Sequence, residues 1–251
     1  MNPLEIRKHI LSKIPEGSVI PRHTENEHLY EVVPSGNRIY KSVTTRLQIL
    51  KDPSLANYKM NRALDYVFAN YHKFTDDNIM EHIDNASKVA GGILKDAGDV
   101  GTSIHEYREA YFNQWIKHQK KPENILNFIP PYQTDRRVVS GMRALDKFIT
   151  ERDYTPLITE QYVWDDEYEV AGTLDDIGLL RRTHREGNAI CDHEMFVDKR
   201  DTHRCLKCDL KYGYELVLMD LKTSNQFKDH FFFQVSMYHM MFKRLTGLKP
   251  K

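Results

Sequence analysis

The segment Tyr214-Glu215-Leu216-Val217-Leu218-Met219-Asp220-Leu221-Lys222-Thr223 is a short apolar run that ends in charged residues. Such a run is typical of a buried β-strand, and the period of two places Asp220 and Lys222 on the same face. Removing a carboxylate and an ammonium group from water at the end of an apolar strand is costly. Metal chemistry would explain this placement; an exposed strand end with an ordinary ion pair is the alternative.

The composition of the chain sets limits on its class. The 251 residues include 36 Lys and Arg and 36 Asp and Glu, and 40% are hydrophobic, which is typical of a soluble globular protein. A net charge of zero excludes a bulk polycation, so contact with nucleic acid requires a local basic groove. No apolar run reaches the length of a membrane span, and residues 1–5 lack a signal-peptide core. We therefore expect a cytoplasmic protein.

Periodicity and turn residues divide the chain into a helix-rich region with a small hairpin, residues 1–98, and a core, residues 99–251. A helix is expected to begin at Gly101, because Ser103 and Glu106 have the spacing of a capping box. The remaining expected elements are helices at 3–13, 58–71, 136–150 and 229–245, a hairpin of 28–33 with 37–42, and antiparallel strands at 157–164 and 168–180.

A second carboxylate lies within an apolar strand, in the sequence Gly172-Thr173-Leu174-Asp175-Asp176. If this strand pairs with the segment from Tyr214 to Thr223, Asp175 lies near Asp220. Two neighbouring carboxylates repel, which raises one pKa or recruits a metal ion. Gly172 would allow another group to approach the strand closely. His105 lies beside the apolar stripe of its helix, where a histidine on its own is more often structural.

Residues 183–213 form an insertion between these two strands that is longer than an ordinary hairpin loop. All three cysteines of the chain lie here, an odd count that argues against a disulfide framework. Cys191, His193, Cys205 and Cys208 have the spacing of a tetrahedral Zn²⁺ site, with His203 as a substitute ligand. Four protein ligands leave no open position, so the zinc would be structural. The alternative is a polar loop with incidental cysteines.

Four short motifs occur in a particular order: Gly101-Thr102-Ser103-Ile104-His105, Gly172 to Asp175, Asp220-Leu221-Lys222, and Gln234 to Tyr238. This order resembles the PD-(D/E)XK nuclease superfamily, in particular its RecB-like exonuclease branch. Ser42-Val43-Thr44-Thr45 is similar to a segment of its phage-type and mitochondrial-genome-maintenance-type members. The resemblance covers about residues 40 to 247. It implies a restriction-endonuclease-like α/β fold, in which helices flank a central mixed sheet.

The resemblance also implies roles for individual residues. His105, Asp175, Asp220 and the Leu221 carbonyl would bind Mg²⁺ or Mn²⁺, since hard oxygen ligands suit these ions. Lys222 would orient or deprotonate the attacking water. The expected contacts with DNA are made by Gln234, Tyr238 and the basic residues Arg136, Arg137 and Arg143, the last three of which are otherwise a solvated helix face.

The resulting hypothesis is a metal-dependent DNA exonuclease of phage type, acting on DNA with a free end in recombination or repair. An endonuclease with the same core is the first alternative. A non-catalytic, zinc-stabilised DNA-binding module is the second. This sequence departs from many members by having Asp220 instead of Glu and by containing the cysteine-bearing insertion. Strand preference, polarity and oligomeric state stay open, because fold alone does not decide them.

Overall fold

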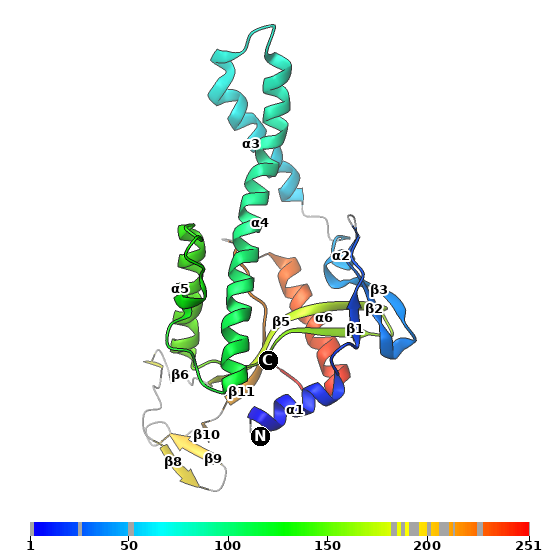
Figure 1. Cartoon of the computed structure of the whole chain (residues 1–251), viewed down its shortest axis with the longest axis vertical. Helices are drawn as coiled ribbons and strands as arrows, with labels where there is room; N and C mark the ends of the chain where they lie inside the picture. Colours follow the sequence, from blue (N-terminus) through cyan, green and yellow to red (C-terminus); the bar gives the residue numbers. More distant parts are fainter. Residues whose placement is uncertain are drawn as a thin grey trace.

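Six strands form a mixed sheet that carries the rest of the molecule (Figure 1). The computed structural model describes residues 3–24, 27–49, 53–181, 185–186, 189–190, 196–199, 202–205, 211–212, 214–224 and 228–250. For residues 53–55 and for the short strands between 185 and 212, only the backbone is described. The six strands are β1 (Val19–Pro21), β2 (Leu29–Val32), β3 (Arg38–Ser42), β4 (Thr155–Asp165), β5 (Val170–Arg181) and β11 (Tyr214–Met219).

Strand β5 pairs with one strand along one edge and with two different strands along the other. One edge pairs antiparallel with β4, from Val170 to Leu179. The other edge is shared, because β3 runs parallel beside Val170 and Ala171 while β11 runs antiparallel beside Asp176 to Arg181. Between these two pairings, residues 172–175 have no ladder partner on that edge within the described chain. The motif from Gly172 to Asp175 therefore lies in a gap between two strands.

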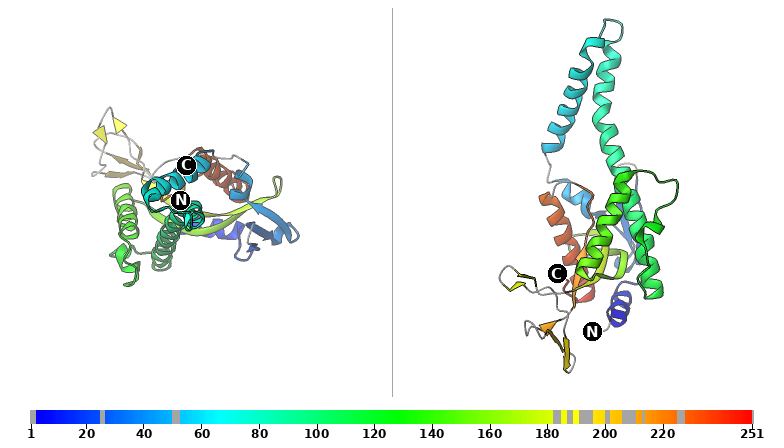
Figure 2. Two further views of the ribbon diagram at one scale, coloured as in Figure 1. Left: turned by 90° about the horizontal axis from the view of Figure 1, so that it is seen from above. Right: turned by 90° about the vertical axis from the view of Figure 1, so that its left-hand side faces the viewer.

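Helices cover both faces of this sheet (Figure 2). One buried cluster joins the sheet to α1 (Pro3–Lys13), α2 (Val43–Leu47) and α6 (Asp229–Thr246). A second cluster joins it to the C-terminal half of α4 and to α5 (Arg136–Arg152). The chain is thus an α/β protein with a mixed sheet between helical layers. The predicted helices at 3–13, 136–150 and 229–245 are confirmed, as are the hairpin and the two antiparallel strands.

A long helical hairpin projects from this body (Figures 1 and 2). It consists of α3 (Pro53–Asn70) and the N-terminal half of α4 (Ile79–His118), a helix of 40 residues. The expectation of a helix start at Gly101 is wrong: Gly101 lies inside α4, and the Ser103 hydroxyl donates to the Asp99 carbonyl one turn earlier, at 3.0 Å. The division expected between residues 98 and 99 also falls inside α4.

Short elements complete the described chain. They are the 3-10 helices η1 (Val33–Ser35), η2 (Tyr71–Lys73) and η3 (Ile125–Phe128), a strand pair β6 (Arg185–Glu186) and β7 (Ala189–Ile190), and a small sheet of β8 (Phe196–Lys199), β9 (Thr202–Cys205) and β10 (Lys211–Tyr212). Of the expected zinc ligands, Cys191, His193 and Cys208 lie outside the described residues, and Cys205 is described by its backbone alone. Within the described ranges, no helix combines the length and the apolar character that a lipid bilayer requires.

Candidate metal centre

The alternation of side chains along β5 slips by one residue at Asp175. Leu174 and Ile177 both pack in the cluster beneath α6, although they are three residues apart. Asp175 and Asp176 lie between them, and both of their carboxylates reach Arg108 of α4, on the other face. Strict alternation would have placed these two acids on opposite faces. The slip therefore gathers two carboxylates on the side that faces α4.

Glu160 of β4 lies opposite this slip and has a strained backbone. Its φ of 50° is in the left-handed region, which non-glycine residues rarely adopt within a strand. Such strain persists only where the surroundings enforce it, and it often accompanies a functional site. The conformation directs the Glu160 carboxylate toward α4, where it forms an ion pair with Arg108.

His105, Glu160 and Asp175 converge on one point. Each offers one ligand atom, and these three atoms lie within 4.8 Å of one another. The residues come from α4, β4 and β5, so the fold brings together positions separated by 70 residues of sequence. Two carboxylate oxygens and one imidazole nitrogen form a donor set that suits Mg²⁺ or Mn²⁺, with water completing the coordination.

The environment of His105 favours a neutral ring with one free lone pair. Its Nε2 lies 3.1 Å from the Leu221 carbonyl, and its Nδ1 lies 3.7 Å from Oδ2 of Asp175. Burial lowers the pKa of His105 and outweighs the opposing effect of Asp175. A neutral imidazole that donates from Nε2 to the carbonyl has an unprotonated Nδ1, which then faces a carboxylate oxygen. Two acceptors that face each other are stabilised by a cation between them. The Leu221 carbonyl thus orients the imidazole here.

Arg108 is fully buried. It neutralises part of an acidic cluster formed by Glu160, Asp175 and Asp176. Its Nη1 lies 3.1 Å from Asp175 and 3.5 Å from Asp176, and its Nη2 contacts Glu160. Burial opposes the charged form of Arg108, but the three carboxylates outweigh it and raise the pKa. Neither oxygen of Asp176 has a hydrogen-bond partner of good geometry within the described chain. One guanidinium therefore serves more carboxylates than it can satisfy.

Burial shifts two acids of this cluster, Asp176 and Glu160, toward the protonated form. It raises the pKa of Asp176 to about 7, against the opposing effect of Arg108. It also raises the pKa of Glu160 to about 7, although Arg108 is in contact. Carboxylates that are protonated near neutral pH without a metal ion are expected where several acids share a desolvated site. A divalent cation would reverse this shift.

Asp220 and Lys222 lie next to this group. The Leu221 amide donates to Oδ2 of Asp175 at 2.7 Å, which anchors the segment after β11 to the gap in the β5 edge. Nζ of Lys222 lies 2.7 Å from Asp220 and 5.3 Å from the centre of the Phe231 ring. Burial, followed by Asp175, raises the pKa of Asp220. Asp220 does not belong to the group whose ligand atoms lie within 4.8 Å of each other.

The Gln234 and Tyr238 side chains are buried on α6 rather than exposed. Nε2 of Gln234 donates to the Tyr238 hydroxyl at 3.4 Å. Gly172 makes room for this tyrosine, since a Cβ built at Gly172 would lie 2.8 Å from Cε1 of Tyr238 and 3.3 Å from a methyl group of Val43. Ser42, which precedes Val43, caps α2 by accepting from the Thr45 amide at 2.9 Å. These motif residues pack against one another beside the acidic cluster.

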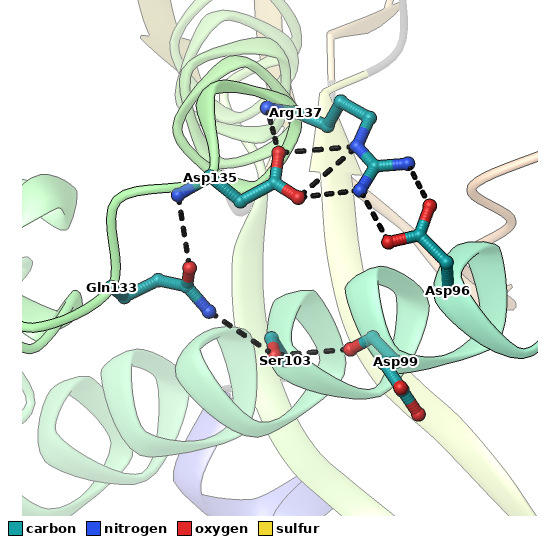
Figure 3. Close-up of polar contacts among 6 residues, drawn as sticks. All are labelled: Asp96, Asp99, Ser103, Gln133, Asp135 and Arg137. Atoms are coloured by element: carbon teal, nitrogen blue, oxygen red, sulfur yellow. Dashed lines mark hydrogen bonds and ion pairs between the residues drawn. The ribbon is translucent and has the colours of Figure 1, made fainter.

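Arg137 is held by two carboxylates (Figure 3). It forms a bidentate pair with Asp96 of α4, at 2.6 and 2.9 Å, and it also contacts Asp135, the residue that caps α5. These hydrogen bonds lower the pKa of both Asp96 and Asp135. Arg137 thereby ties the start of α5 to α4. The other two basic residues of this helix that were expected to contact DNA, Arg136 and Arg143, are exposed.

Two hollows border the cluster. One of about 310 Å³ is lined by Glu160 together with Arg7, Asn113 and Gln161. The other, of about 580 Å³, lies between α4, α5 and the end of β11, and its lining includes Asp220 and Lys222.

Sequence reasoning gave Asp176 no role and missed two further members of the cluster, Glu160 and Arg108. The last two carried a weak signal. Glu160 is an acid inside an apolar strand, like Asp175. Arg108 is three residues after His105, which places these two side chains on one face of a helix.

Comparison of the chain with models of known protein families, with curated proteins and with solved structures found no match.

Proposed function

We propose that this chain is a metal-dependent deoxyribonuclease with a restriction-endonuclease-like core, and that it acts as an exonuclease. The observation that carries the proposal is the convergence of His105, Glu160 and Asp175 beside the Asp220–Lys222 pair. An ordinary ion pair between Asp220 and Lys222 would require neither the strained backbone of Glu160 nor a histidine lone pair directed at a carboxylate. The sequence motifs that resemble the RecB-like branch support the same reading.

The charge balance of the cluster also favours a divalent ion. In the ion pairs of the described residues, four carboxylates, those of Glu160, Asp175, Asp176 and Asp220, share two cations, Arg108 and Lys222. With a neutral His105, full ionisation leaves two formal negative charges. One Mg²⁺ or Mn²⁺ would balance them, whereas protonation of two acids is the alternative without metal.

Each residue then has a distinct task. His105, Glu160 and Asp175 would hold the ion, which supplies Lewis-acid polarisation of the scissile phosphate and a lower pKa for a coordinated water. The Leu221 carbonyl orients the imidazole of His105. Lys222 has a half-buried ammonium next to Asp220 and would hold the attacking water or stabilise the charge that develops on the phosphate.

A time course on end-labelled single- and double-stranded DNA with Mg²⁺ or Mn²⁺ tests the proposal. We expect Asp175→Asn and Lys222→Met to reduce cleavage by about 10²–10³-fold or more. Glu106→Gln and Lys147→Met are matched controls, because Glu106 is exposed on α4 next to His105 and Lys147 is exposed on α5. Cleavage of the labelled DNA at the same rate by the wild-type protein and by the Asp175→Asn variant would refute the proposal.

A closed circular substrate separates exonuclease from endonuclease action. We expect no cleavage of the intact circle and rapid digestion after linearisation. Cleavage of the circle would identify an endonuclease. If wild-type protein leaves every DNA substrate intact but binds it, the chain is a non-catalytic DNA-binding module.

A further inference from the structure

The hairpin of α3 and the N-terminal half of α4 presents an apolar face that nothing in the described chain covers. Nine large hydrophobic side chains on it are between 37% and 72% exposed. They are Met60, Leu64, Phe68, Tyr71, Ile79, Met80, Ile83, Ile93 and Leu94. Side chains of this size and exposure present on the order of 900 Å² of apolar surface, beyond the ~300–600 Å² of the largest patch on a typical monomer.

The spacing of these residues is that of a helix bundle. On α3, Met60, Leu64, Val67 and Tyr71 recur at intervals of four, three and four. On α4, the same alternation of four and three runs without a break through Ile79, Ile83, Ala86, Ala90, Ile93 and Ala97. Alternating intervals of four and three are the heptad pattern of helices that pack against other helices. The α3–α4 contact buries Ala86 and Ala90 but leaves the isoleucines half exposed.

The two stripes lie on one flank of the hairpin. Tyr66 and His82 mark the contact between the helices, since the Tyr66 hydroxyl lies 3.0 Å from Nδ1 of His82. At ~100° per residue, the centre of the α4 stripe lies about 60° round from His82 and that of the α3 stripe about 130° round from Tyr66. The helices run antiparallel, so these two rotations of the same sign turn toward the same side. The hairpin therefore offers one continuous apolar face.

We propose that this face binds the same face of a second copy of the chain, so that two hairpins form a four-helix bundle. The area is close to the ~800 Å² that each partner contributes to a standard interface. A two-fold axis matches each heptad stripe with one of identical length and spacing, which a twofold-symmetric dimer requires. Between residues 53 and 98, five Lys and Arg stand against six Asp and Glu, so the hairpin lacks the positive charge that a nucleic-acid surface needs.

Light scattering on the full chain at low micromolar concentration tests this dimer, whether or not the chain is a nuclease. We expect twice the 29.6 kDa of one chain. The double variant Phe68→Glu/Ile83→Glu should be monomeric, with an unchanged unfolding transition of the body. Tyr132→Glu is the matched control, because Tyr132 is 83% exposed and lies outside the hairpin, and this variant should stay dimeric.

Hydrogen exchange of the wild-type protein provides a second measurement that needs no variant. Amides of residues 56–94 should exchange faster after dilution, whereas those of β5 should not change. A monomeric wild type, a dimer that survives the double variant, or exchange that is independent of concentration would each overturn the proposal. Loss of DNA binding by the double variant at unchanged mass would assign the face to nucleic acid instead.

Discussion

Nδ1 of His105 lies 3.7 Å from Oδ2 of Asp175, and both atoms are acceptors when the imidazole donates from Nε2 to Leu221. Such a pair needs a positive charge between or beside its members. Arg108 supplies part of it, at 3.1 Å from Asp175. The behaviour of the protein without a divalent ion should therefore depend strongly on this arginine.

Arg108→Met should destabilise the metal-free protein by about 3–5 kcal/mol, because it leaves buried carboxylates without a cation. Adding Mn²⁺ should raise the melting temperature of this variant more than that of wild type, since the ion replaces the lost charge. Differential scanning fluorimetry with and without chelator measures both effects. Arg137→Met removes an exposed ion pair instead and should cause a much smaller loss. Equal metal responses in all three proteins would contradict the expectation.

The stability of the metal-free protein should fall as pH rises from about 4 to about 7. The pKa of Asp176 is raised to about 7 by burial, so the folded chain holds a proton that the unfolded chain has already lost. The folded state binds more protons in this window, and unfolding becomes easier by up to ~1.4 kcal/mol per pH unit. Denaturant titrations in chelator measure the slope. Asp176→Asn should flatten it, and Glu106→Gln should not.

Metal binding near pH 7 should release protons, because burial raises the pKa of Glu160 to about 7 and a ligand must be ionised. Affinity should therefore increase with pH through this range. Calorimetry in two buffers of different ionisation enthalpy gives the number of protons released. Glu160→Gln should reduce this number and weaken binding on the order of 10–100-fold. Binding of Mn²⁺ with the same affinity and the same proton release in the variant would exclude Glu160 as a ligand.

Gly172→Ala should destabilise the protein by about 1–3 kcal/mol, since the added methyl group would lie 2.8 Å from the Tyr238 ring. The cost should decrease in a Tyr238→Leu background, which a double-mutant cycle measures. Gly91→Ala is the control, because no atom of the described residues lies within 4 Å of a Cβ at this position of α4. We expect it to stabilise the helix by about 0.5–1 kcal/mol. A Gly172→Ala variant as stable as wild type would show that the strand can shift to admit the methyl group.

The insertion should contain about one zinc per chain, held by Cys191, His193, Cys205 and Cys208. Elemental analysis of protein purified without chelator measures it. Cys208→Ser should reduce the zinc content. Wild-type protein without zinc would refute the proposed zinc site.

The sequence patterns predicted most of the elements around the cluster because these elements follow local rules. Alternation and turn residues placed β4 and β5, and the expected helix at 229–245 matches α6 to within one residue. A period of two predicted Asp220 and Lys222 side by side on a strand; they are in contact at 2.7 Å, but β11 ends at Met219 and both residues lie in the segment that follows it. Pairing of β5 with β11 then brings Asp175 next to Leu221, whose amide donates a hydrogen bond to the Asp175 carboxylate.

Glu160 was not predicted because its position depends on an exception. A residue with φ of 50° inside a strand breaks the alternation on which the prediction rests. The true start of α4 was missed because Ser103 and Glu106 have capping-box spacing, which indicated a start at Gly101. In the structure the Ser103 hydroxyl bonds to the Asp99 carbonyl inside a continuous helix instead.

The uninterrupted course of α4 has a further consequence for how this chain can change in evolution. The helix spans ~60 Å, and the same backbone carries the apolar stripe at one end and the imidazole of His105 at the other. Each inserted or deleted residue rotates one end against the other by ~100°, so a single-residue change would turn the exposed stripe away from its orientation relative to the body. Length variants that preserve this orientation should differ by whole multiples of about seven residues, with matching changes in α3.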